Sequence, residues 1–124
     1  MREIPMPFLS IVKSSEQQGP PPQALMDAMD KFVAESLRDG TVLQTGGLGP
    51  SSKGARFRVS KGKLTVTDGP FTEAKEILGG YAVLAAKTRE AALADARRFM
   101  ELHTRHWPDW EGECEVREIV FLAP

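Results

Sequence analysis

Residues 81–86 constrain the fold of this chain more than any other stretch. These residues, Tyr-Ala-Val-Leu-Ala-Ala, are continuously apolar, and they lie between Gly79-Gly80 and Lys87. A short run without polar alternation places apolar side chains on both faces of a strand, which is typical of a central β-strand buried on both faces. The rest of the chain is therefore expected to supply neighbouring strands and a cover for each face.

Two amphipathic helices are available to cover a sheet. Apolar residues recur at three- and four-residue intervals through residues 25–37, and Gly40 is placed to end this helix. A second apolar stripe runs through residues 92–103, with Thr88 as the expected N-cap and Pro108 as the stop. Both patterns predict helices with one buried face.

Other segments have the composition of strands. Residues 8–13 and 113–121 are short and rich in apolar and β-branched side chains, and residues 41–48 begin as a strand that the following glycines are expected to turn into a loop. Apolar residues alternate with basic or hydroxylic ones through residues 55–60 and 63–67, which predicts a β-hairpin. Its two faces would be apolar and basic.

The segment between this hairpin and the central strand has a different composition. Residues 72–77 are expected to form a single helical turn capped by Thr72, and Gly79-Gly80 is expected to release it before the strand begins. Residues 14–22 contain three consecutive prolines and are expected to be a loop.

The order of these elements defines a fold class. Strand, helix, strand, hairpin, strand, helix, strand is the ferredoxin-like split βαβ arrangement with an inserted β-hairpin, an α+β fold in one domain of residues 1–124. Two helices cover only one face of the antiparallel sheet, so we expect a homodimer packed sheet against sheet. The alternative is that the hairpin, or the Pro-rich loop, covers the second face within one chain.

Composition limits the classes of function. Sixteen basic and seventeen acidic residues give a net charge of -1, so no overall field favours direct binding to nucleic acid or to an anionic membrane. No apolar run approaches the roughly 20 residues of a membrane span, and the first residues lack the apolar core of a signal peptide. We expect a cytoplasmic protein.

The motif at residues 66–71, Val-Thr-Asp-Gly-Pro-Phe, leaves a carboxylate where a strand turns. Alternation places Asp68 on the same side as Leu64, so we expect Phe71 to cover it and desolvation to raise its pKa, as a general base requires. Asp68 is thus the candidate catalytic residue. The alternative is that its carboxylate caps the turn by accepting the backbone N–H of Phe71 or Thr72.

Candidate ligand-binding residues surround this motif. The loop of residues 46–56 offers backbone amides, two hydroxyls and two cations, which suit a phosphate or a carboxylate, although it matches neither the dinucleotide fingerprint nor the P-loop. Two interpretations are open for Lys75, Glu76 and Lys13: their charged side chains line the same cleft, or they are simply solvated. The full set of ligand-binding candidates is Lys13, Ser51, Ser52, Lys53, Arg56, Pro70, Phe71, Lys75 and Glu76.

Several other reactive residue types have simpler explanations. His103 and His106 lie at a helix end, where the dipole favours histidine, so we predict neither a metal site nor a cofactor. Cys114 stands between two glutamates that raise a thiol pKa, which disfavours a nucleophile. Trp107 and Trp110 are expected to pack against the end of the second helix rather than to bind a ligand.

Three runs carry a family resemblance: residues 49–56, residues 66–76 and Gly79-Gly80-Tyr81. They resemble the DGPF-domain branch of the YCII-related family. The resemblance implies a ferredoxin-like domain that dimerises into an α+β barrel, and it extends to proteins associated with extracytoplasmic-function sigma factors and to degradative enzymes of small molecules. Many relatives have a glutamate before the Gly-Leu of the central loop, where this chain has Gly46. The other branch of the YCII-related family has a His-Asp pair proposed as a site, and this chain lacks the histidine of that pair, because both of its histidines lie late in the sequence.

Two functions follow as hypotheses. The first is binding of a small molecule in a cleft beside the Asp-Gly-Pro-Phe turn, with lyase- or isomerase-like acid-base activity. The second is a non-catalytic regulatory or accessory module that partners a sigma factor. The sequence does not decide between an enzyme and a binding module.

Overall fold

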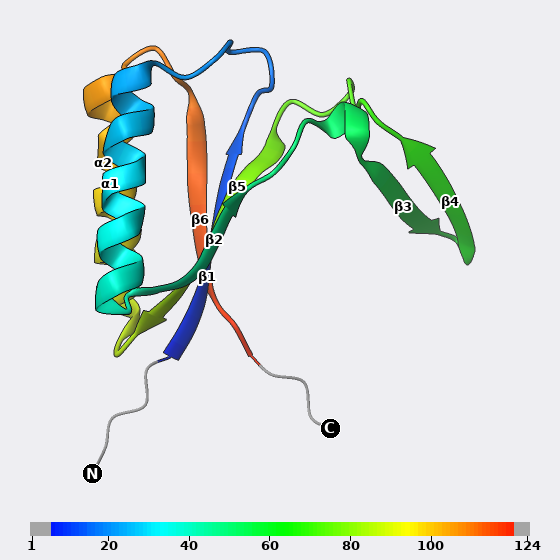
Figure 1. The fold of residues 1–124 in the computed structure, drawn as a ribbon. Coiled ribbons are helices and arrows are strands. Elements are labelled where there is room, and N and C mark those ends of the chain that lie inside the picture. The colour runs from blue at the N-terminus through cyan, green and yellow to red at the C-terminus, as the bar shows by residue number, and fades with distance from the viewer. Residues whose placement is uncertain (1–5, 121–124) are drawn as a thin grey trace.

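The computed structural model describes residues 6–120 and contains a four-stranded sheet, two helices and a separate hairpin (Figure 1). The elements in chain order are β1 (Met6–Ser14), α1 (Gln23–Asp39), β2 (Val42–Gly47), the 3-10 helix η1 (Ser51–Lys53), β3 (Ala55–Ser60), β4 (Lys63–Asp68), β5 (Ile77–Ala86), α2 (Arg89–His106) and β6 (Gly112–Glu118). The sheet order is β2-β5-β1-β6, and all its neighbours are antiparallel. The predicted α+β, ferredoxin-like order with an inserted hairpin is confirmed.

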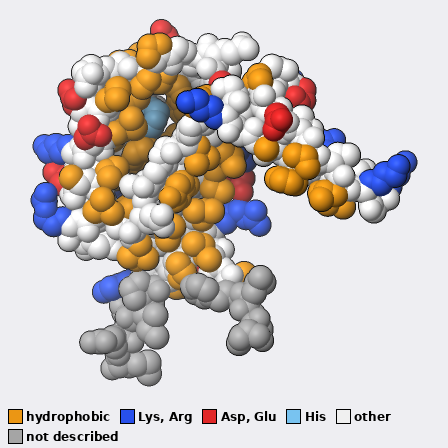
Figure 2. Space-filling model, turned by 45° about the vertical axis from the view of Figure 1, so that its right-hand side comes forward, with side chains coloured by type: hydrophobic (Ala, Val, Ile, Leu, Met, Phe, Trp, Pro, Cys, Tyr) orange, Lys and Arg blue, Asp and Glu red, His pale blue; other side chains and the backbone are white. Residues whose placement is uncertain are grey.

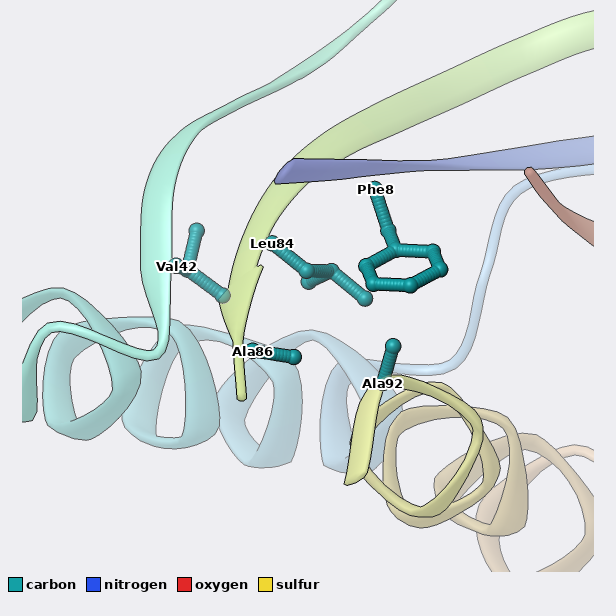
Figure 3. Close-up of a cluster of buried hydrophobic side chains, with 5 residues drawn as sticks. All are labelled: Phe8, Val42, Leu84, Ala86 and Ala92. Carbon is teal, nitrogen blue, oxygen red and sulfur yellow. The ribbon is translucent and has the colours of Figure 1, made fainter. Parts of the chain in front are cut away.

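Both helices pack on one face of the sheet (Figure 1). Phe8 on β1 lies directly opposite Leu84 on β5, and both side chains point toward the helices. Figure 3 shows these two residues together with Val42, Ala86 and Ala92 in the main buried cluster. Burial of a side chain such as Leu84 contributes roughly 1.5–3 kcal/mol, so this cluster stabilises the four-stranded sheet with its two helices, which we call the body.

The other face of the sheet carries Leu9 and Ile11 from β1, paired with Val83 and Tyr81 from β5. We call this surface the open face, because no helix lies on it in the described part of the chain (Figure 1). These side chains are only partly buried. In the single chain, residues 81–86 are therefore covered only on the side of the helices, and cover of their second face by another copy stays a prediction.

The helix ends follow their sequence signals. α1 is followed by Gly40 with a φ of 84°, the left-handed conformation that glycine adopts without a steric penalty. α2 begins after Thr88, whose hydroxyl accepts the backbone N–H of Ala91. Both expected helices are confirmed.

Neither glycine pair lies outside the strands as expected: Gly46-Gly47 was expected to turn β2 into a loop, and Gly79-Gly80 to precede the central strand. Gly46 and Gly47 belong to β2, where they lie opposite Tyr81 and Gly80 of β5. A Cβ on Gly46 would lie 3.2 Å from Cε1 of Tyr81, so glycine lets the tyrosine ring lie against the neighbouring strand. Backbone pairing across the sheet continues through both glycine pairs, which is why the expected breaks at these positions are wrong.

Residues 72–77 do not form the expected helical turn. The N–H of Ala74 donates to the carbonyl of Phe71 at 3.1 Å, which closes a single tight turn, and Ile77 already pairs with Ser14 as the first residue of β5. A segment this short does not sustain a helix by itself. Pairing with β1 supplies more hydrogen bonds, so the strand begins early.

The hairpin of β3 and β4, which we call the arm, extends away from the sheet (Figure 1). Its turn is Lys61-Gly62, with φ values of 52° and 77° as in the tight turns that connect twisted strands. Phe57 lies opposite Val66, and Val59 lies opposite Leu64. The predicted hairpin is confirmed, and it does not fold over the open face of its own chain.

Candidate functional site

Asp68 is the last residue of β4 and lies opposite Ala55. Its side chain is exposed, so the expected partial desolvation is wrong. The reason is the direction of the arm: Leu64 and Val66, which share its face, are themselves exposed. No hydrogen bond to the Asp68 carboxylate is found among residues 6–120, and the N–H of Phe71 donates to another side chain. Its catalytic role remains a prediction.

The turn that follows Asp68 packs tightly against the loop before β3. The N–H of Gly69 donates to the carbonyl of Gly54 at 2.9 Å, and the Gly69-Pro70 peptide bond is cis. A Cβ on Gly69 would lie only 1.6 Å from the carbonyl oxygen of Ser51. Only glycine permits this approach of the two backbones.

Ser51 joins three loops. Its N–H and hydroxyl donate to the two carboxylate oxygens of Glu16 at 2.7 Å and 2.5 Å, and its hydroxyl oxygen accepts the N–H of Phe71 at 3.3 Å. The Ser51 hydroxyl, followed by its backbone N–H, lowers the pKa of the Glu16 carboxyl group. This Glu16–Ser51 link ties the Pro-rich loop to the base of the arm.

Sequence reasoning did not single out Glu16. It lies in a loop, 35 positions away from Ser51 along the chain, and no local pattern pairs the two residues. The proximity becomes evident only when β1 and β2 both pair with β5 and bring the two loops to the same end of the sheet.

Arg56 and Phe71 are brought together as the sequence suggested. The guanidinium carbon of Arg56 lies 4.1 Å from the centre of the Phe71 ring, and the same guanidinium forms an ion pair with Glu73. Arg56 is therefore already engaged by an aromatic face and a carboxylate. Of the remaining candidates, Pro70 lies in the same turn, whereas Ser52, Lys53, Lys75 and Glu76 have exposed side chains.

Lys13 does not join this group. Its ammonium group lies 3.1 Å from a carboxylate oxygen of Glu115 and 3.5 Å from one of Glu113, both on β6. The hydrogen bond to Glu115 is the largest cause of the raised pKa of Lys13. Two acidic partners occupy this cation, so it is poorly placed to hold an anionic ligand.

A cavity of about 420 Å³ lies between the helices and the sheet. Figure 2 shows a hollow in the body surrounded by hydrophobic side chains, with a histidine inside it. On the sheet side the cavity is lined by small residues, including Ser10, Ser14, Gly80 and Ala82. Because these side chains are short, they do not fill the space between the strands and the helices.

The helix side of the same cavity, which we call the sheet–helix cavity, is aromatic. Phe32 on α1 and Phe99 on α2 lie with their ring centroids 5.9 Å apart, and Trp107 and Trp110 after α2 complete this wall. The two tryptophans pack against the end of the second helix as expected, and they line the cavity as well. The lining is predominantly apolar, as in most small-molecule sites.

His103 is the buried polar side chain of this wall, with only 7% of its surface exposed. Its ring lies 4.6 Å from the Trp110 ring and 5.5 Å from the Phe99 ring, measured between centroids. Its Nδ1 atom is buried and has no hydrogen-bond partner of good geometry among residues 6–120. Burial lowers the pKa of His103, although the backbone carbonyls of Phe99 and Met100 act in the opposite direction.

The charged side chains of the lining are acidic. Asp30 and Asp95 line the cavity, and no lysine or arginine does so among the described residues. Burial raises the pKa of the Asp95 carboxyl group, whereas its ion pair with Arg98 acts in the opposite direction. A second hollow, of about 460 Å³, lies beyond the end of α2 and shares His103 and both tryptophans with the first.

The comparison with protein families gives a match over almost the whole described chain. The model of the YCII-related domain matches residues 6–119. The chain belongs to the YCII-related domain family. The comparison with curated proteins gives no match.

Two further features of this YCII-related domain bear on its chemistry. Within residues 6–120, no three side chains of the types His, Cys, Asp and Glu are grouped so that they could hold a metal ion. Neither described helix is long and apolar enough to cross a membrane. The polar side chains in the lining of the sheet–helix cavity are His103, the two acidic residues and several hydroxyl-bearing residues.

Proposed function

We propose that this YCII-related domain binds a small organic molecule in the sheet–helix cavity. The observation that carries the proposal is the cavity itself: about 420 Å³, with a floor of small residues and an aromatic wall. Small-molecule sites typically have volumes of roughly 300–1,000 Å³ and mostly apolar walls with a few polar groups. His103 is such a group, because it lines the cavity and only 7% of its surface is exposed.

This proposal moves the ligand away from the Asp-Gly-Pro-Phe turn. Asp68 lines neither hollow, and its exposed carboxylate lacks the desolvated surroundings that would tune a general base. Gly69 and Ser51 lie in backbone contact, which supports a structural role for the turn. Binding, rather than acid-base catalysis at Asp68, is the function that the geometry favours.

We also propose that the protein works as a homodimer. The open face carries the apolar side chains of Leu9, Ile11 and Val83, and the arm adds an exposed apolar surface of its own. Exposed apolar surfaces of this kind are typical of interfaces between protein chains. A second copy, placed sheet against sheet, would cover the open face symmetrically. Light scattering that gives a monomer mass at high protein concentration would contradict this proposal.

A thermal-shift screen with one cavity-filling variant tests ligand binding. A compound that binds only the folded protein raises its melting temperature. Ala82→Leu places three more carbon atoms at the cavity floor, so it should remain folded and lose the shift. Ala34→Leu on the exposed side of α1 is the matched control and should keep it. If no compound shifts the unaltered protein, or if Ala82→Leu responds equally, the cavity is not a binding site.

A further inference from the structure

We propose that the ligand of the sheet–helix cavity is an uncharged, largely apolar molecule whose hydroxyl group forms a hydrogen bond with His103. This inference rests on the proposed function, since it specifies what the same cavity accepts. Three features of the cavity carry it: a lining without basic side chains among the described residues, the buried imidazole of His103, and the aromatic wall.

The charges of the lining disfavour an anion. Asp30 and Asp95 are the acidic residues of the lining, and among the described residues no lysine or arginine lines it. A carboxylate or phosphate that entered would lose its hydration without gaining a cationic partner. The cavity therefore discriminates against the anionic ligands that the loop at residues 46–56 suggested.

The same acidic residues do not make a strong site for a cation. The carboxylate of Asp95 already forms an ion pair with Arg98, and the side chain of Asp30 is exposed to solvent, where its attraction for an ammonium group is weakened. A cationic ligand would also place its charge against the aromatic and aliphatic wall. An uncharged molecule avoids both costs.

His103 defines the polar group of the ligand. Burial favours the neutral imidazole, which carries one donor and one acceptor nitrogen. The Nδ1 atom is buried inside the protein, beside the backbone carbonyls of Phe99 and Met100, so the other ring nitrogen, Nε2, is the one left to pair with a ligand. A hydroxyl both donates and accepts, and it therefore pairs with Nε2 in either tautomer.

The remainder of the ligand is apolar. Phe32, Phe99, Trp107 and Trp110 form one wall, and short side chains of β1 and β5 form the opposite floor. Aromatic walls of this kind favour flat, apolar surfaces over polar ones. A volume of about 420 Å³ accommodates a molecule with two fused rings.

Four probes of nearly equal size separate these features. They are 2-naphthalenemethanol, 2-methylnaphthalene, 2-naphthoate and 2-naphthylmethylammonium, which differ in the presence of a hydroxyl and in charge. Calorimetric titration of the full chain at pH 7 should show that the alcohol binds about tenfold more tightly than methylnaphthalene. It should bind about a hundredfold more tightly than naphthoate, and also more tightly than the ammonium compound.

Variants of His103 locate the preference. His103→Phe keeps an aromatic ring but removes the nitrogen atoms, so the alcohol and methylnaphthalene should bind equally. His103→Gln retains a donor and an acceptor near the position of Nε2 and should restore part of the preference. His106→Phe, on the same helix but outside the cavity lining, is the matched control and should leave the preference unchanged.

Failure of this inference is distinguishable from failure of the proposed function. If none of the four probes binds and no other compound does, the cavity is not a ligand site. If methylnaphthalene, naphthoate or the ammonium compound binds as tightly as the alcohol, the cavity is a site but the hydroxyl assignment is wrong. A preference that survives in His103→Phe would also overturn the assignment. The four-probe comparison on the unaltered protein decides the question if that variant does not fold.

Discussion

The body and the arm of this domain use the same strand pattern with opposite results. In the body, β1 and β5 bury Phe8 and Leu84 under the helices, where 3% and 4% of their surfaces are exposed. In the arm, β3 and β4 leave four apolar side chains 56–72% exposed: Phe57, Val59, Leu64 and Val66. Alternation thus determines which side chains share a face, but not whether anything covers that face.

The cover depends on the connections. Each helix of the body follows a strand of the sheet and returns over the same face, so the cover is part of the chain. The arm has no helix of its own, and it extends away from the sheet (Figure 1). An exposed apolar hairpin of two strands is marginally stable by itself, which is the physical reason to expect a partner surface.

The largest expected effect separates the two faces of one strand. Leu84→Asp places an unpaired charge in the core under the helices, and it should lower the free energy of unfolding by about 4 kcal/mol or more. Val83→Asp places the same charge on the open face, so the monomer should fold but should not dimerise. Denaturant unfolding and light scattering measure the two outcomes. Equal unfolding by both substitutions would show that the faces do not differ.

The next effect concerns the joint between the body and the arm. Gly69→Ala forces a Cβ into the carbonyl group of Ser51, and it should cost about 2 kcal/mol of stability. Gly62→Ala at the tip of the arm meets no atom within 4 Å, so only its positive φ is strained and the cost should be about 1 kcal/mol. Thermal unfolding gives the comparison. A smaller loss at position 69 than at position 62 would contradict the tight joint.

The exposed face of the arm is expected to affect assembly more than folding. Phe57→Ser and Val66→Ser should each change the free energy of unfolding of the monomer by no more than about 0.5 kcal/mol, because both side chains are exposed. If the arm packs on a second copy, each substitution should weaken dimerisation by about tenfold. Arg58→Ser, on the opposite face of β3, is the control and should leave the dimer unchanged. Analytical ultracentrifugation measures the dissociation constant of the dimer for each variant.

The smallest effect is the pH dependence of the Glu16–Ser51 link. Since hydrogen bonds from Ser51 lower the pKa of Glu16 from 4.5, the link stabilises the folded state above pH 4.5 and loses this effect as the pH falls through the lower, folded-state value. Glu16→Gln removes this titration, so the stability difference between the two proteins should shrink in acid. Unfolding curves between pH 7 and pH 3 measure it. A constant difference across that range would exclude the link as its source.

Much of the fold could be predicted from local patterns. The helices are marked by periodic apolar stripes, Gly40 and Thr88, and the hairpin by its alternation around Lys61-Gly62. The glycine pairs were misjudged because their role depends on the strand beside them. Gly46 looks like a break when read alone, yet in the sheet it makes room for the ring of Tyr81.

The candidate site was less predictable. Asp68 was correctly placed at a strand end, but its burial depended on the direction of the arm, which no local pattern specifies. The sheet–helix cavity arises from residues that are individually unremarkable, such as Ser10 and Ala82, which lie on different strands. His103 was placed on the buried stripe of its helix, and its unpartnered nitrogen becomes evident only when the helix packs.

The position of the two tryptophans has a practical consequence. The chain contains only two, Trp107 and Trp110, and both line the sheet–helix cavity beside His103. Indole emission responds to the polarity and to the aromatic contacts of its surroundings, and no other tryptophan contributes a background signal. The native protein therefore carries a built-in optical probe at the place where occupancy matters, and filling of the cavity can be followed by fluorescence without any label.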